Sequence, residues 1–111
     1  MVVRTVTAVT GDEVRGLAAQ VLRRLPAGEP GAVVLGLGDG GRAQLVAMIN
    51  ERFLELTGVE AVGLLRTAAK EVGGGAGGTG LVANAGGRRA EGLDRALDQV
   101  RHELRTLLAP H

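Results

Sequence analysis

A glycine-dense segment between two helix-like runs constrains this chain more than any other feature. It runs from Gly73 to Gly87, reads GGGAGGTGLVANAGG, and contains eight glycines in fifteen residues. A folded chain accepts so much glycine only where the backbone must reach positive φ or approach another group closely. We therefore expect a glycine loop here, with a short strand from Leu81 to Ala85, and we expect this segment to carry the function.

The composition removes several classes of chemistry. The 111 residues include no cysteine, serine, tyrosine or tryptophan, which excludes disulfides, thiolate metal sites and the common serine and cysteine nucleophiles. His102 has no second histidine or carboxylate at convincing ligand spacing. We expect no catalytic residue, no metal and no cofactor in this chain, whether it is a free protein or a fragment of a longer enzyme.

The charge is nearly balanced. Thirteen basic and twelve acidic side chains leave a net charge of +1, so any binding of nucleic acid must depend on a local patch. The apolar runs are short and interrupted by charge or glycine, and the first residues lack the order of a signal peptide. We expect one domain, residues 1–111, in the cytoplasm and away from membranes.

The first third of the chain predicts a strand and then a helix. Val2 to Val9 is rich in β-branched residues and reads as a strand. Thr10 and Glu13 have the T-x-x-E spacing of a capping box, in which side chains satisfy the free amides at a helix start. An apolar stripe at helical spacing follows, and Pro26, Gly28 and Pro30 end the helix; the stripe consists of Val14, Leu17, Ala18, Val21, Leu22 and Leu25.

The middle of the chain allows two interpretations. Gly31 to Leu37 reads as an interior strand, and Gly36 to Gly41 then matches G-x-G-x-x-G, the fingerprint of a dinucleotide site if a helix follows. Alternatively, Asp39-Gly40 forms a hairpin turn and Ala43 to Ile49 alternates along a returning strand. The hairpin is favoured because no second parallel strand with a terminal acidic residue follows at the Rossmann spacing.

The remaining sequence predicts two more amphipathic helices. Thr57 to Glu60 repeats the T-x-x-E pattern before an apolar stripe from Val59 to Val72, and Leu93 to Leu108 carries a second stripe. The expected fold is an α/β (α+β) two-layer sandwich, in which helices cover one face of a small mixed or antiparallel sheet. The expected order is β-α-β-β-α, a glycine loop with a short β, and α.

Two runs of the glycine segment resemble a known family. They are VGGGAGG, from Val72 to Gly78, and ANAGG, from Ala83 to Gly87, and the helix-forming LDRALDQV follows. Together they resemble the C-terminal globular module of alanyl-tRNA synthetase, from the superfamily of the domain that accompanies DHH phosphoesterases. The β-α opening and the Asp39-Gly40 hairpin also fall where that family has them, so the resemblance covers nearly the whole chain.

The chain departs from the family at three places in this segment. Gly75 or Ala76 stands where the family has a basic residue, and Thr79-Gly80 stands where it has Arg or Lys. Asn84 replaces the usual Gln and is one methylene shorter.

The resemblance implies a tRNA-binding accessory module. Such a module reads the folded shape of alanine tRNA near its elbow and holds it for aminoacylation and editing by other domains. Its implied partners are tRNA, other domains of a synthetase or a second copy of the chain. The residues implied to contact RNA are Gly73, Gly74, Gly77, Gly78, Asn84, Gly86, Gly87, Arg88 and Arg89.

Elementary physics offers a route for such contacts. Backbone amides in glycine-rich turns form anion-binding nests, and the dipole at the start of the last helix would add to one. Arg88 and Arg89 follow Gly87 directly and would supply two phosphate contacts. The structural alternative is that the glycines let the loop pack closely under a helix while both arginines are solvated.

Two further functions stay open. A protein-interaction or dimerisation module of the same fold is favoured by the missing basic residues and the small net charge. An enzyme that holds a nucleotide phosphate is the weaker hypothesis, because no general base, metal cluster or P-loop lysine accompanies the glycines.

Overall fold

A hairpin of two eight-residue strands forms the centre of the sheet. β2 (Ala32–Asp39) and β3 (Arg42–Ile49) pair antiparallel, and Gly40 and Gly41 connect them with φ of 57° and 84°. Two consecutive positive φ angles are typical of the type I′ turn that matches the twist of paired strands. The hairpin interpretation is therefore confirmed. The dinucleotide interpretation is wrong, because a strand follows the G-x-G-x-x-G pattern where a helix is needed.

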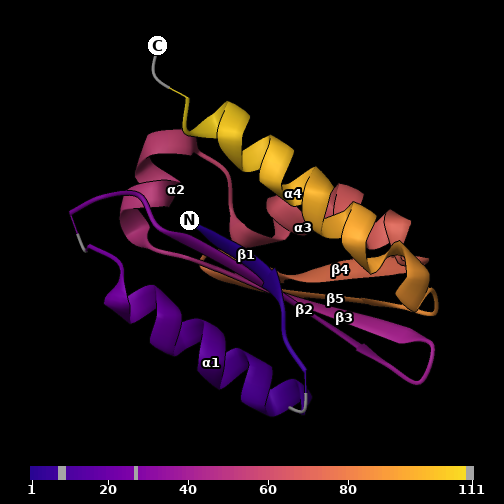
Figure 1. Ribbon diagram of the computed structural model, residues 1–111. Coiled ribbons are helices and arrows are strands. Elements are labelled where there is room, and N and C mark those ends of the chain that lie inside the picture. The colour runs from indigo at the N-terminus through magenta and orange to yellow at the C-terminus, as the bar shows by residue number, and fades with distance from the viewer. Residues whose placement is uncertain (8–9, 27, 110–111) are drawn as a thin grey trace.

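The computed structural model describes residues 1–7, 10–26 and 28–109, and shows a mixed five-stranded sheet (Figure 1). The strand order is β1-β2-β3-β5-β4; β1 pairs parallel with β2 and every other pair is antiparallel. The remaining strands are β1 (Val2–Thr5), β4 (Gly74–Thr79) and β5 (Val82–Gly87). The helices are α1 (Gly11–Arg24), α2 (Glu51–Thr57), α3 (Ala61–Glu71) and α4 (Leu93–Leu107), with a 3₁₀ turn, η1 (Ala90–Gly92), before α4.

The glycine segment is a second hairpin. We expected a loop and a short strand, but β4 and β5 pair along their whole length and β5 also pairs with β3. The strand expected at Leu81 to Ala85 is confirmed as β5, with its bounds shifted to Val82–Gly87. Glycine is a poor strand former, so the pairing depends on β3 beside it and on α3 above it rather than on local preference.

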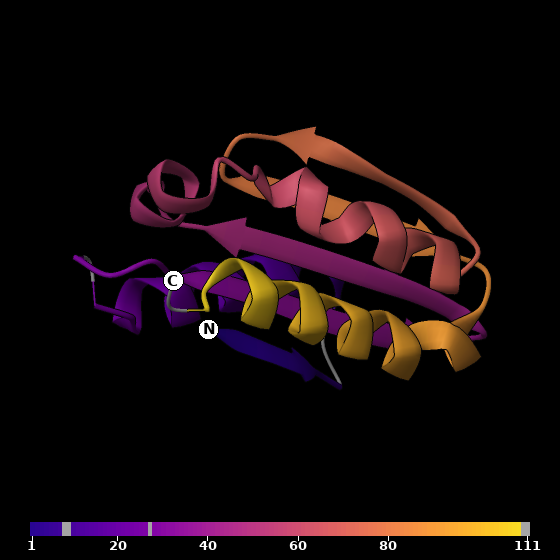
Figure 2. The ribbon, with the colours of Figure 1, turned by 90° about the horizontal axis from the view of Figure 1, so that it is seen from above.

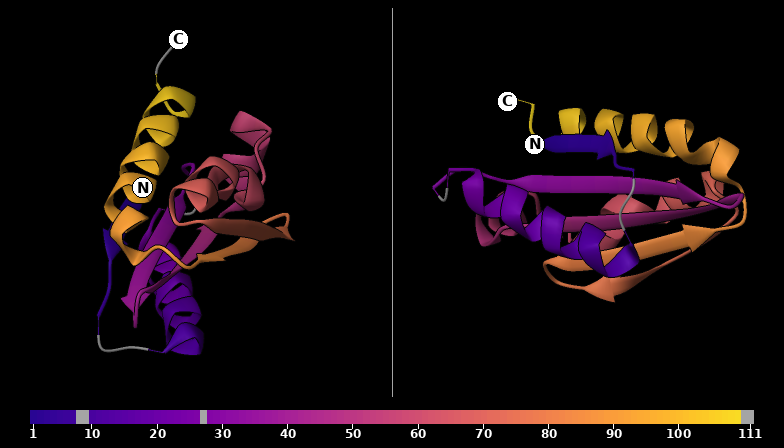
Figure 3. Two further views of the ribbon diagram at one scale, coloured as in Figure 1. Left: turned by 90° about the vertical axis from the view of Figure 1, so that its right-hand side faces the viewer. Right: turned by 60° about the horizontal axis from the view of Figure 1, so that its bottom comes forward.

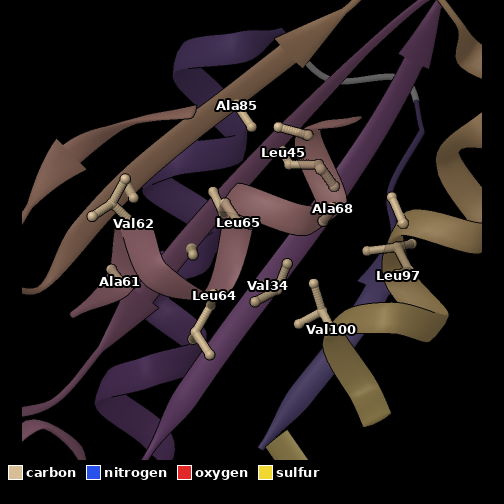
Figure 4. Packing of buried hydrophobic residues seen from close by; sticks show 14 of the residues in the cluster. Val34, Leu45, Ala61, Val62, Leu64, Leu65, Ala68, Ala85, Leu97 and Val100 are labelled. Carbon is tan, nitrogen blue, oxygen red and sulfur yellow. The ribbon is translucent and has the colours of Figure 1, made fainter. Parts of the chain in front are cut away.

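The helices lie on both faces of the sheet. α3 and α4 lie side by side over one face, where α3 also contacts β4 and β5 (Figure 2). Figure 4 shows the core beneath them, in which Val34 and Leu45 from the sheet meet Leu65 and Leu97. The α/β class, the mixed sheet and the two-layer arrangement of sheet with α3 and α4 are confirmed.

The helix α1 corrects the expectation that all helices share one face. Figure 3 shows α1 on the face of the sheet opposite to α3 and α4. Val33 and Leu35 of β2 pack there with Val14 and Ala18 of α1. Gly31 to Leu37 is buried throughout, so β2 is covered on both sides. A continuous apolar run is the usual signature of such a strand.

The strand at the N-terminus is shorter than expected. β1 ends at Thr5, and Val9 of the expected strand lies outside the described residues. β1 forms one edge of the sheet, where Arg101 of α4 donates a 3.0 Å hydrogen bond to the carbonyl of Val3. In the described part of the chain, no helix has both the length and the apolar character needed to cross a bilayer.

The two T-x-x-E patterns behave differently. Thr10 caps α1 as expected, because its Oγ1 accepts a 3.3 Å hydrogen bond from the amide of Glu13. Thr57 instead ends α2, a short helix that the sequence analysis missed, and its hydroxyl donates to the carbonyl of Phe53. The helix α3 starts after Glu60, which makes no side-chain cap bond. The second capping prediction is therefore wrong.

Asn50 joins three segments at the start of α2. Its Oδ1 accepts from the amides of Phe53 at 2.8 Å and Gly31 at 2.9 Å, and its Nδ2 donates to the carbonyl of Glu29 at 2.8 Å. We expect Asn50→Ala to lower the free energy of unfolding by about 2 to 3 kcal/mol, since a helix cap and two further hydrogen bonds are removed. Urea denaturation checks this, with Thr10→Ala, an exposed cap worth about 1 kcal/mol, as the comparison. A smaller loss for Asn50→Ala than for Thr10→Ala would contradict the prediction.

We expect Glu103 on α4 to give the fold a pH dependence. Burial raises the pKa of its carboxyl above the ordinary value, and a hydrogen bond from Gln99 opposes this shift. A raised carboxyl pKa means that the folded state favours the protonated form, so this stability is present in acid and is lost as pH rises through the folded pKa. We expect Glu103→Gln to raise the urea midpoint at pH 7, and this gain to shrink below the ordinary carboxyl range. A gain that stays constant with pH would contradict the assignment.

Candidate nucleic-acid interface

Part of one sheet face is left uncovered. α1 packs over β2 and β3, while β4 and β5 extend beyond it (Figure 3). Residues directly opposite one another in a sheet share a face. Val46, which packs against α1, lies opposite Asn84, and Asn84 lies opposite Gly77. The uncovered surface of β4 and β5 is therefore on the same side of the sheet as α1.

A groove of about 420 Å³ runs between α1 and this surface. Its floor is formed by Gly75, Asn84 and Gly86 of the glycine hairpin, with Gln44 of β3 beside them. Its wall is the first turn of α1. The complete lining is Gly11, Asp12, Arg15, Gln44, Leu45, Val46, Gly75, Asn84, Ala85 and Gly86.

A second hollow of about 300 Å³ adjoins the groove, because Gln44 and Gly86 line both. Arg42, at the start of β3, and Arg88, directly after β5, stand at this end. We call the two hollows together the sheet-face groove. Three arginines and one aspartate line it, Arg15, Arg42 and Arg88 against Asp12, so its local formal charge is +2. The groove is thus a local basic patch on a chain whose net charge is only +1.

The two consecutive arginines have different surroundings. Arg88 lines the sheet-face groove, whereas the guanidinium of Arg89 donates a 3.2 Å hydrogen bond to the carbonyl of Lys70 at the end of α3. This carbonyl also accepts from the amide of Gly73 at 3.1 Å, so Arg89 adds a charged donor at the helix end, where the helix dipole favours a cation. The backbone amide of Arg89 also donates to the carbonyl of Val72. The structure thus gives Arg89 a role in holding α3 and does not place it beside Arg88 in the groove.

Some glycines of the segment are required by the fold itself. A Cβ on Gly74 would collide with the carbonyl of Gly86, and one on Gly87 would collide with the carbonyl of Val72. A Cβ on Gly78 would meet the backbone of β5 in the same way. Their lack of a side chain lets β4, β5 and the end of α3 approach closely. Packing therefore explains these glycines without any ligand.

Other glycines of the segment have no such explanation. A Cβ on Gly75 or Gly77 would meet nothing within 4 Å, and neither residue has a positive φ. A Cβ on Gly86 would make only an ordinary contact at 3.6 Å, with the carbonyl of Ala43. All three face the open side of the sheet. Here the chain presents bare backbone that its own fold does not require.

The residues that the resemblance implied to contact RNA therefore fall into two groups in the structure. Gly77, Asn84, Gly86 and Arg88 lie on the uncovered face or in its groove, whereas Gly73, Gly74, Gly78 and Arg89 are engaged in close packing and in the end of α3. Gly87 borders the second hollow and is also required by packing.

Three residues of the groove were not predicted from the sequence: Arg15, Arg42 and Gln44. Arg42 and Gln44 alternate with the buried Ala43 and Leu45, which is the signal that placed them on the opposite face. Arg15 had no comparable signal, because its position depends on the face that α1 covers.

The groove can bind an anion but has few groups for covalent chemistry. Its polar side chains are guanidinium groups, amides and a single carboxylate. Among the described residues, no group of three or more histidine, aspartate and glutamate side chains could hold a metal ion.

The chain matches known proteins over nearly its whole length. Residues 1–106 match the model of the DHHA1 domain. The chain is 39% identical over 94 residues to an alanine–tRNA ligase of a Nocardioides species, covering 85% of the chain and 10% of that ligase. It is 38% identical over 112 residues to the alanine–tRNA ligase of a Synechococcus species, covering 97% and 12%. A probable chloroplastic/mitochondrial alanine–tRNA ligase of Ostreococcus tauri is 41% identical over 81 residues, covering 73% of the chain and 8% of that ligase.

A solved structure has the same fold as this chain. The C-Ala domain of Aquifex aeolicus alanyl-tRNA synthetase matches with a TM-score of 0.76 and 20% identity, over 98% of this chain and 91% of that one. The chain spans about a tenth of the length of the ligases that it matches. Because the DHHA1 model matches residues 1–106, this chain belongs to the DHHA1 domain family.

Proposed function

We propose that this chain is a tRNA-binding module of the alanyl-tRNA synthetase type, with the sheet-face groove as its binding surface. It holds alanine tRNA, at the elbow, for aminoacylation and editing that other domains perform. Two kinds of observation support this: the relatives are named alanine–tRNA ligases, and the groove is lined by three arginines against one carboxylate. We place this function in the cytoplasm or in an organelle that makes its own proteins.

The bare backbone at Gly75, Gly77 and Gly86 carries the proposal. Glycine inside a strand costs stability relative to residues with side chains, and it often marks a place where a ligand approaches the backbone closely. The fold leaves room for a side chain at all three positions, so an approach from outside explains them where internal packing does not.

The arginines around the groove suit a nucleic-acid backbone. Guanidinium groups form charge-assisted, often bidentate hydrogen bonds with phosphate, and phosphate contacts fix the position of a protein on its nucleic acid. Arg15 stands at one end of the groove and Arg42 and Arg88 stand at the other. One ribose-phosphate strand lying on the glycine floor can meet both ends.

A test separates binding from stability by substituting glycine. Gly75→Ala together with Gly77→Ala should leave the free energy of unfolding unchanged or raise it by about 0.4 to 1 kcal/mol for each compatible site. The same double variant should weaken binding to folded alanine tRNA by about tenfold, which corresponds to about 1.4 kcal/mol. Fluorescence anisotropy and urea denaturation give the two readouts. Gly74→Ala is the contrasting variant, since overpacking should cost about 2 to 3 kcal/mol of stability.

A second test uses the salt dependence of binding. Wild-type chain is titrated with alanine tRNA, an unrelated tRNA and a linear RNA at several salt concentrations. Arg42→Ala with Arg88→Ala should reduce the slope of log K against log salt by about 0.9 for each phosphate that the variant no longer neutralises. Arg23→Ala with Arg24→Ala, which removes two charges from the exposed last turn of α1, is the matched control and should change the slope little.

The outcomes also decide between classes of function. Selective binding to folded tRNA supports the proposal. No binding at low salt, from a chain shown to be folded by circular dichroism, would reject it and favour the protein-interaction module. An equal reduction of the slope in the control pair would mean that binding follows total charge rather than the groove.

A further inference from the structure

We propose that Asn84 is a positioning residue that holds the guanidinium of Arg15 over the groove floor for contact with an RNA phosphate, and that its neutrality is part of this role. The inference rests on the proposed function of the sheet-face groove. Its starting point is one hydrogen bond, in which Nε of Arg15 donates to Oδ1 of Asn84 at 3.1 Å. The two residues are 69 positions apart in the sequence.

The hydrogen bond spans the groove from wall to floor. Arg15 follows Val14, whose buried side chain anchors the first turns of α1 to β2 and β3. Asn84 stands on β5 between Ala83 and Ala85, which are buried in the separate core under α3 and α4. The two cores lie on opposite faces of the sheet, so this contact fixes the exposed side chain of Arg15, on the wall, against Asn84 on the floor. A free arginine side chain loses about 2 kcal/mol of rotamer entropy when it is ordered. Binding in a prepared orientation avoids part of that cost.

The geometry leaves the outer part of the guanidinium available. Asn84 engages Nε, and the structure gives no hydrogen bond to either terminal nitrogen of Arg15 among the described residues. The two terminal nitrogens present the edge that binds phosphate in a bidentate manner. Gln44 lies against Gly11 on the neighbouring part of the wall, with its Oε1 2.9 Å from the position that a Cβ would take. Arg15 itself lines the groove, beside Asn84 and Gly86 of the floor.

The choice of an amide as the partner has an electrostatic consequence. A carboxylate would bind the guanidinium more strongly, because both partners would carry charge, but it would also cancel the charge of the guanidinium. The amide oxygen of Asn84 orients the group and leaves its full charge for the ligand. Asp12 also lines the groove, yet it forms no ion pair with Arg15 among the described side chains.

The experiment is a double-mutant cycle of RNA binding with a charge variant beside it. The chains are wild type, Arg15→Ala, Asn84→Ala, the double variant and Asn84→Asp, each titrated with folded alanine tRNA at several salt concentrations. In the wild-type chain, Asn84→Ala should weaken RNA binding by about threefold to tenfold. In a chain that already carries Arg15→Ala, it should not change the affinity further, because the proposed role of Asn84 is to position Arg15. It should leave the salt slope close to the wild-type value, since no charge is removed.

The variant Asn84→Asp distinguishes orientation from charge. It keeps the acceptor and the size of the side chain, so a purely structural tie should be preserved or strengthened. If Arg15 contacts phosphate, Asn84→Asp should weaken binding as much as Arg15→Ala and lower the salt slope by about 0.9. Gln20→Glu, on an exposed position of α1 outside the groove lining, is the control for the added negative charge.

Three results would overturn the inference. An equal loss of affinity from Asn84→Ala with and without Arg15 would show that the two residues act independently. Wild-type binding by Asn84→Asp would show that the charge of Arg15 is not used. If the folded wild-type chain binds no RNA at any salt concentration, the proposed function fails as well. If wild type binds and only the cycle shows no coupling, the inference alone fails.

Discussion

The burial of β2 on both faces is the constraint on which the rest of the structure depends. One set of its side chains, with Val33 and Leu35, receives α1, and the alternate set, with Val34, receives α3 and α4. Because α1 is held over β2 and β3, it cannot cover β4 and β5. The sheet-face groove is therefore a direct product of where the apolar side chains of β2 point, and its wall and floor belong to different cores.

The glycines of the hairpin serve two purposes within a few residues of one another. Gly74 and Gly87 let the end of α3 and the two strands approach closely, and Gly75 and Gly86 leave the opposite face bare. In a strand these two sets alternate, because successive residues face opposite sides. The glycines look alike in the sequence, but they thus form two sets. One set is required for close packing on one face, and the other leaves the opposite face open.

Sequence reasoning predicted most of the fold and less of the site. The central hairpin, α1, α3, α4 and β5 followed from periodicity and from turn and cap residues, since these are local signals. The strand β4 could not be predicted because GGAGGT has no side-chain pattern, and its pairing comes from α3 and β5. The position of α1 and the separation of Arg88 from Arg89 depend on tertiary packing, which a single sequence does not show.

The insertion of β5 between β3 and β4 also sets an order in which the chain can assemble. The hairpin of β2 and β3 can form early from neighbouring residues, but the outer edge of β3 stays open until β5 arrives from about forty residues later, since Ala43 pairs with Gly87. The glycine-rich strands have little tendency to form alone, so we expect them to pair with this edge only once α3 has docked. Until then, one face of β3 that is buried in the finished fold is exposed to other chains; it carries Leu45 and Ile49. The glycines that keep the mature surface bare also form strands poorly, and we therefore expect the closing of the sheet to be a late event in folding.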